Sequence, residues 1–106
     1  MMLTTPTKLV TIIGEAVLED RLVRLVLKEG ASGYTLTTCS GQGSRGLRST
    51  TPIGAQNVRI EVVAGPDVAD RILRRLEAEF FPHYAVVAWL TDAAVIRGAK
   101  FGDHQG

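Results

Sequence analysis

The chain has 106 residues, of which 45% are hydrophobic, and a formal net charge of +1. This length suits one domain, and so small a net charge gives no global field that would favour nucleic acid or a membrane surface. The single cysteine, Cys39, excludes an intrachain disulfide framework and a cysteine-based zinc site. No apolar run has the length of a membrane span, and the first residues lack the pattern of a secretory signal, so we expect a cytoplasmic protein.

The first half of the chain has the pattern strand, helix, strand. Residues 8–13 are a short apolar run, typical of a strand. Residues 15–29 are predicted to form a helix, with acidic residues near its start and Gly30 as its stop. Residues 34–39 are rich in β-branched side chains and predict a second strand. The apolar face of the helix repeats at i, i+4, i+7 and i+8, with Leu18, Leu22, Leu25 and Val26.

The second half repeats this order. Residues 58–64 alternate in polarity like a strand. A helix is predicted between residues 65 and 82, because one proline stands in its first turn and another at its end. Residues 84–90 are apolar nearly throughout and predict a fourth strand. A short extended piece over residues 94–97 precedes a polar tail, residues 98–106, which we expect to be flexible.

This order predicts an α+β fold, a ferredoxin-like βαββαβ sandwich with two helices on one face of a four-stranded sheet. Residues 84–90 are apolar on both faces, which in an antiparallel sheet indicates that both faces are covered. Since only two helices are available, we expect another copy of the chain to provide the second cover.

The connection over residues 40–57 is 18 residues long, well beyond a normal hairpin loop. Its base combines glycines, which let backbone N–H groups approach an anion, with Arg45 and Arg48, whose planar guanidinium groups match phosphate oxygens. An anion-binding loop and a flexible surface loop with incidental arginines both fit these residues. The glycines have the G-x-G-x-x-G spacing of a dinucleotide fingerprint, but turn-forming residues follow them instead of the required helix. These glycines are Gly41, Gly43 and Gly46.

Four short stretches carry a resemblance to a known family. They are Gly33-Tyr-Thr, Gly41-Gln-Gly-Ser-Arg-Gly-Leu-Arg-Ser, Phe81-Pro-His-Tyr and Ala94-Val-Ile-Arg-Gly. They resemble the PII-like signalling proteins, and most of all the carboxysome-associated and SbtB-type members, over residues 8–100. The chain is therefore expected to be a single PII-like domain, residues 1–106, in which residues 40–57 form the T-loop.

The resemblance implies a homotrimer that binds adenine nucleotides in the clefts between subunits. In this interpretation the base of the T-loop contacts the phosphates, and the segment after the last strand closes the site from the neighbouring subunit, through Arg97 and Gly98. Thr35 and Val62 would belong to the adenine pocket. The loop residues carried over by position are Gly41, Gly43, Ser44, Arg45 and Arg48.

The function implied by the resemblance is regulatory. ADP, AMP or ATP would act as an effector that changes the T-loop conformation, with no prosthetic group, no metal and no catalytic residue. The branch acts in inorganic-carbon metabolism, so a bicarbonate transporter or a carboxysome component is the expected partner of the T-loop. The sequence leaves open which nucleotide is preferred and whether bicarbonate binds directly. The tail over residues 101–106 lacks the paired cysteines of some relatives, and residues 40–57 lack the tyrosine that other PII proteins have modified.

Two other classes of function remain open. A small phosphate-ester hydrolase on the same fold would need a base or nucleophile near Arg45, where the sequence offers hydroxyls and a cysteine. An RNA-binding module would need aromatic side chains along the middle strands, which carry mainly threonine, valine and isoleucine. A metal site at Asp103 and His104 would have only two ligands.

Overall fold

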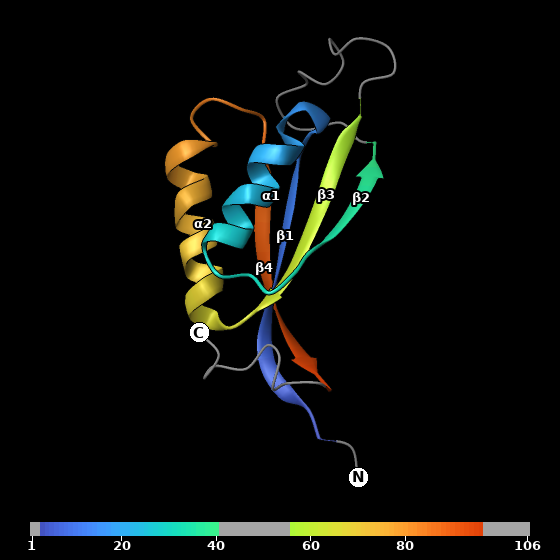
Figure 1. The fold of residues 1–106 in the computed structure, drawn as a ribbon, viewed down its shortest axis with the longest axis vertical. Helices are drawn as coiled ribbons and strands as arrows, with labels where there is room; N and C mark the ends of the chain where they lie inside the picture. The colour runs from blue at the N-terminus through green and yellow to red at the C-terminus, as the bar shows by residue number, and fades with distance from the viewer. Residues whose placement is uncertain (1–2, 41–55, 97–106) are drawn as a thin grey trace.

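The structure, a computed structural model, describes residues 3–40 and 56–96. Within these ranges it has four strands, two α-helices and one short 3-10 helix, in the predicted strand–helix–strand order (Figure 1). The predicted α+β ferredoxin-like sandwich is therefore confirmed. In chain order the elements are β1 (Thr5–Glu15), η1 (Ala16–Leu18), α1 (Glu19–Lys28), β2 (Thr35–Cys39), β3 (Asn57–Ala64), α2 (Pro66–Glu79) and β4 (Val87–Val95).

The four strands form one antiparallel sheet in the order β2-β3-β1-β4. The long strand β1 lies in the middle. It pairs with β3 from Lys8–Ala64 to Glu15–Asn57 and with β4 from Thr5–Val95 to Ile13–Val87. Both helices lie on one face of this sheet, as Figure 1 shows.

The core lies between the sheet and the helices. Alternate residues of the central strands, such as Val10 and Ile12, are 0% exposed, because the period of a strand sends them to the helix-covered face. The apolar stripe predicted for the first helix faces them, and its members are at most 3% exposed. Fully burying one such aliphatic side chain contributes about 1.5–3 kcal/mol. The buried members of this stripe are Leu18, Leu22, Leu25 and Val26.

The first helix begins later than the sequence predicts. Instead of starting at residue 15, α1 starts at Glu19, after the 3-10 turn Ala16–Leu18. The reason is a contact with a distant part of the chain. Glu15 still pairs with Asn57 of β3, and the Ala16 backbone N–H donates a hydrogen bond to the Gln56 carbonyl at 2.8 Å. These bonds hold the chain extended where its local preference is helical.

The last strand also differs from the prediction. It begins at Val87 rather than at residue 84, because the Tyr84 N–H is bonded to the Phe80 carbonyl at 2.9 Å in a turn that follows α2. It then runs unbroken to Val95, so residues 94 and 95 are part of it rather than a separate piece. Pairing with the first residues of β1, from Thr5 onward, explains the extra length.

Candidate functional site

The two strands that carry the long loop end side by side. Cys39 of β2 pairs with Asn57 of β3, and Asn57 in turn pairs with Glu15 of β1. The hydrogen bond from Ala16 to the carbonyl of Gln56 ties the second side of the loop to η1. Both ends of the loop are therefore anchored at one end of the sheet (Figure 1).

Most of the predicted nucleotide contacts lie outside the described residues. They fall in the loop and just after β4, and their roles stay predictions. They are Gly41, Gly43, Ser44, Arg45, Arg48, Arg97 and Gly98.

The strand pairings place the starting points of the two segments that carry the predicted site far apart within one chain. The loop follows Cys39, beside the Glu15 end of β1, whereas Arg97 follows β4, whose last residue Val95 pairs with Thr5. Ten steps of β1, at about 3.3 Å each, put about 33 Å between these ends. Strand β4 itself runs away from the end of the sheet where β2 ends and β3 begins (Figure 1). The loop base and the segment after β4 therefore leave opposite ends of the subunit.

Thr35 and Val62, the residues predicted for the adenine pocket, point to opposite faces of the sheet. Thr35 is exposed and pairs with Glu61, so its side chain lies on the face that the helices leave open. Val62 is the next residue along β3 and is 0% exposed in the core. The whole residue is buried in the subunit, so neither its side chain nor its backbone is exposed to a ligand there. The β2–β3 ladder stops at Thr35–Glu61, so on the β2 side the described residues give Val62 no strand partner.

The structure adds two candidates that the sequence analysis did not select. Arg59 and Glu61 project from β3 on the same open face as Thr35 and Thr37, their cross-strand partners. The Arg59 Nη2 lies 3.3 Å from the Glu61 Oε2, and both side chains remain partly exposed. The alternation of residues 58–64 was the signal for them, because it puts these two charges on the polar side of the strand.

The open face also bears apolar side chains. Trp89 is 40% exposed and Val87 is 48% exposed; both pair with β1 residues whose side chains point away from the helices, Thr11 and Ile13. One chain thus covers only one face of its sheet. The expected cover of this second face by another copy stays a prediction.

A comparison with protein families identifies the family to which this chain is related. The family model for nitrogen regulatory protein P-II matches residues 7–100. The chain belongs to the P-II family. Its predicted membership is confirmed.

Solved structures agree with this assignment. A PII-like signalling protein from Thermus thermophilus is 46% identical, with 95% of this chain and 100% of that chain covered and a TM-score of 0.80. The protein CPII from Thiomonas intermedia, in a structure bound to ADP and bicarbonate, is 24% identical, with 96% and 100% covered and a TM-score of 0.84. Another CPII structure, bound to ADP, AMP and acetate, has 24% identity, coverage of 94% and 98%, and a TM-score of 0.81. For CPII the likeness is one of fold.

Two further properties of this P-II family member concern metals and membranes. Within residues 3–40 and 56–96, no three His, Cys, Asp or Glu side chains gather closely enough to hold a metal ion. In the same part of the chain, neither helix has the length and apolarity needed to cross a bilayer.

Proposed function

We propose that this protein is a signalling protein that binds ADP, AMP or ATP in clefts between the subunits of a homotrimer, and that the bound nucleotide changes the conformation of the T-loop. One observation supports a cleft that is shared between two subunits. The loop and the segment after β4 leave opposite ends of β1, at Asn57 and Val95. A neighbouring subunit is the simplest source of the second half of the site, and P-II family membership supports it.

In this proposal the phosphates meet Arg45 and Arg48 together with the glycines of the loop base. Hydrogen bonds between a guanidinium and a phosphate are short and roughly twice as strong as neutral ones. Arg97 and Gly98 of the neighbouring subunit would close the cleft. The loop residues that complete the phosphate site are Gly41, Gly43 and Ser44.

The adenine and ribose would lie at the start of β2. There the exposed Thr35 stands beside the β3 edge at Val62, whose backbone has no described strand partner on that side. Glu61, opposite Thr35, has a partly exposed carboxylate that can accept hydrogen bonds from ribose hydroxyls. This arrangement places a hydroxyl and a charged acceptor side by side on the open face, where the sugar would bind.

Signalling follows from where the phosphates bind. A loop that supplies phosphate ligands is stabilised in one conformation when the ligand is present, and the ligand shifts the population only by its preference for that conformation. The anchored strand ends at Cys39 and Asn57 confine the change to the segment between them. Different nucleotides would therefore present different loop surfaces to a partner.

We place this signal in inorganic-carbon metabolism in the cytoplasm. The support is the resemblance to the carboxysome-associated branch and the presence of ADP and bicarbonate in a CPII structure. Bicarbonate would act as a second effector, and the T-loop would contact a bicarbonate transporter or a carboxysome component. We propose a regulator without catalytic turnover, in keeping with the regulatory P-II family.

Calorimetry tests this function. AMP, ADP and ATP are titrated into the protein with and without bicarbonate, and product formation is followed in parallel. Binding without turnover is the expected result. Absence of heat and of thermal stabilisation at millimolar nucleotide would refute nucleotide sensing, and steady hydrolysis would favour the phosphate-ester hydrolase instead.

A further inference from the structure

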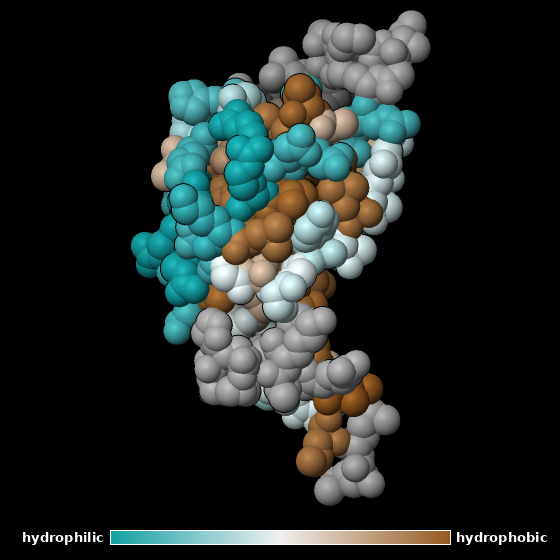
Figure 2. Space-filling view, in the orientation of Figure 1, coloured by the Kyte–Doolittle hydropathy of each residue, from teal (hydrophilic) through white to brown (hydrophobic). Residues whose placement is uncertain are grey.

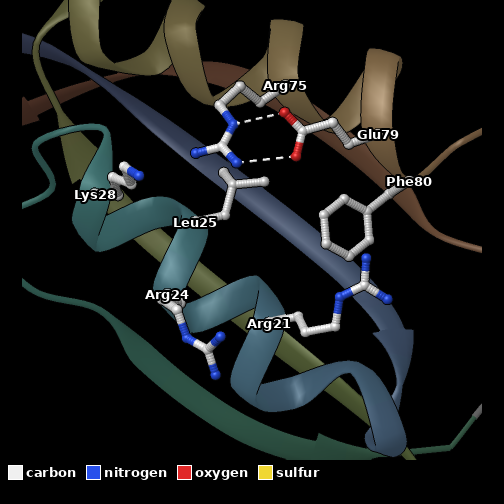
Figure 3. Close-up of a pocket in the computed structure, with 7 residues that line it drawn as sticks. All are labelled: Arg21, Arg24, Leu25, Lys28, Arg75, Glu79 and Phe80. Carbon is white, nitrogen blue, oxygen red and sulfur yellow. Dashed lines mark hydrogen bonds and ion pairs between the residues drawn. The ribbon is translucent and has the colours of Figure 1, made fainter.

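The helix-covered side of the molecule has a hollow that the proposed nucleotide site does not use. It lies between α1 and α2 and has a volume of about 190 Å³. Figure 2 shows strongly hydrophilic side chains over both helices on this side. Figure 3 shows the hollow itself, with α1 and α2 as its two walls. Four of its lining side chains are cations: Arg21, Arg24, Lys28 and Arg75.

On the α2 wall, positive and negative charges compensate each other. The Arg75 Nε and Nη2 donate to the two oxygens of Glu79, both at 2.9 Å, and its Nη1 donates to a Glu29 oxygen at 3.1 Å (Figure 3). All three nitrogens of Arg75 and both oxygens of Glu79 are thus in use. This wall has little charge left for a ligand.

On the α1 wall, the cations keep their charge. The Arg21 guanidinium lies 4.8 Å from the Phe80 ring centroid and 5.2 Å from that of Tyr84, and its Nη1 donates to the Tyr84 hydroxyl at 2.7 Å. These neutral partners fix the guanidinium without neutralising it. Neither Arg24 nor Lys28 has an ion pair within the described part of the chain.

The three α1 cations lie close together on the helix, and Arg24 is at the rim of the groove, with its side chain directed away from α2 (Figure 3). Arg21, Arg24 and Lys28 are spaced i, i+3 and i+7, which puts them on one side of the helix over a rise of about 10 Å. The charges of two of these cations also act on Glu79, on the α2 side of the groove. The pKa of Glu79 is lowered, first by its hydrogen bond with Arg75 and further by the charges of Arg21 and Lys28.

We propose that this groove binds a small anion with two or more phosphate or carboxylate groups, held mainly by Arg21 and Lys28 with Arg24 at the rim. The hollow is smaller than a pocket for a drug-sized ligand and has the volume of about six waters, which suits a compact anion. Arg21 is already oriented, so less conformational entropy is lost on binding. The site lies across the sheet from Thr35 and Glu61, apart from the nucleotide cleft.

The test uses pyrophosphate as the probe and a protein in which the loop cannot bind it. Arg45→Ala and Arg48→Ala are combined as the background, and amide NMR shifts are followed at low ionic strength. We expect saturable shifts in α1 and in the α2 segment around Arg75. Adding Lys28→Gln should weaken binding about tenfold, the loss of one charge-assisted hydrogen bond.

The matched control is Arg74→Gln, which removes one α2 charge whose partner is Asp70 and which lies outside the groove. It should leave the pyrophosphate affinity unchanged. Citrate tests the carboxylate form of the ligand, and saturable binding of either anion supports the site. Two results would overturn the proposal, because both indicate general charge screening instead of a specific site. One is an equal loss of pyrophosphate affinity in Lys28→Gln and Arg74→Gln. The other is the same amide shifts with sodium chloride at equal ionic strength.

Discussion

Asn57 of β3 and Val95 of β4 lie beside opposite ends of β1. Asn57 pairs with Glu15 at the end of β1, and Val95 pairs with Thr5 at its beginning. The long loop leaves the sheet beside Asn57, and the predicted closing segment leaves it after Val95. The register of one antiparallel sheet therefore separates, within each subunit, the two groups of residues that the proposed site must combine.

The loop arginines should act on phosphate rather than on adenosine. Arg45→Ala and Arg48→Ala each remove a charge-assisted hydrogen bond worth about 1.5–3 kcal/mol, so ADP affinity should fall roughly ten- to a hundredfold. Calorimetry with ADP and adenosine measures the difference. Adenosine serves as the control ligand, and an equal loss for both ligands would mean that the arginines support the fold instead of the phosphate.

Trp89 should mark the surface between subunits. It is 40% exposed on the open face of the sheet, so Trp89→Glu would bury an unpaired carboxylate if a second copy covers that face. We expect the variant to be a folded monomer by light scattering and circular dichroism. Val17→Glu is the control, because Val17 is 83% exposed on η1, outside the four strands of the sheet. A Trp89→Glu protein with unchanged mass would place the interface elsewhere.

Gly30 should be difficult to replace. It ends α1 with φ +110°, and a Cβ there would lie 3.3 Å from the Val68 Cγ2. Gly30→Ala should therefore lower the free energy of unfolding by about 1–3 kcal/mol in urea. Gly33→Ala is the matched control, since a Cβ at Gly33 meets no atom within 4 Å. Equal losses at the two positions would rule out the backbone explanation.

Glu79 should contribute stability that depends on pH. Its pKa is lowered from 4.5, first by the hydrogen bond from Arg75. A carboxylate with a depressed folded pKa stabilises the fold above its unfolded pKa and loses that contribution as the pH falls through the folded value. The urea midpoint of wild type should exceed that of Glu79→Gln at pH 7, and the gap should close well below pH 4.5.

Glu77→Gln controls for the loss of one carboxylate from the same helix, since no hydrogen bond or ion pair of Glu77 occurs in the described part of the chain. Its effect should be small and should lack the pH dependence of Glu79→Gln. A gap between wild type and Glu79→Gln that stays constant down to pH 3 would contradict the role of this ion pair.

Local patterns predicted the fold, and distant contacts explain the differences. The helical period of Leu22, Leu25 and Val26 was enough to identify a buried face. It could not predict that Glu15 would pair with Asn57, because that bond joins segments 42 residues apart in sequence. The polar residues Thr91 and Asp92 likewise end the apolar run that predicted the last strand. The strand nevertheless continues to Val95, because these residues pair with β1.

The two candidate sites also differ in how far the sequence alone could predict them. The loop residues of the proposed nucleotide site could be selected from the sequence because they are adjacent in it. The groove could not be predicted, because in the sequence Arg21 has the pattern of a solvated helix face. Its guanidinium is held in place by Phe80 and Tyr84, which come about sixty residues later.

A complementation experiment tests the shared cleft directly. Arg45→Ala alone and Arg97→Ala alone should each bind ADP weakly, because each removes one phosphate ligand from every site. When the two variants are unfolded and reassembled together in equal amounts, random mixing in a cyclic trimer gives about one site in four with Arg45 from one parent and Arg97 from the other.

That fraction of tight ADP sites, measured by calorimetry on the mixture, is the expected outcome. It follows from the positions of Asn57 and Val95, because the loop ends at one end of the sheet and the segment after β4 begins at the other. The double variant Arg45→Ala, Arg97→Ala mixed with wild type controls for reassembly, and it should also yield about one intact site in four. If that control recovers tight sites and the mixture of single variants recovers none, the site would lie within one chain, and the strand-end argument would fail.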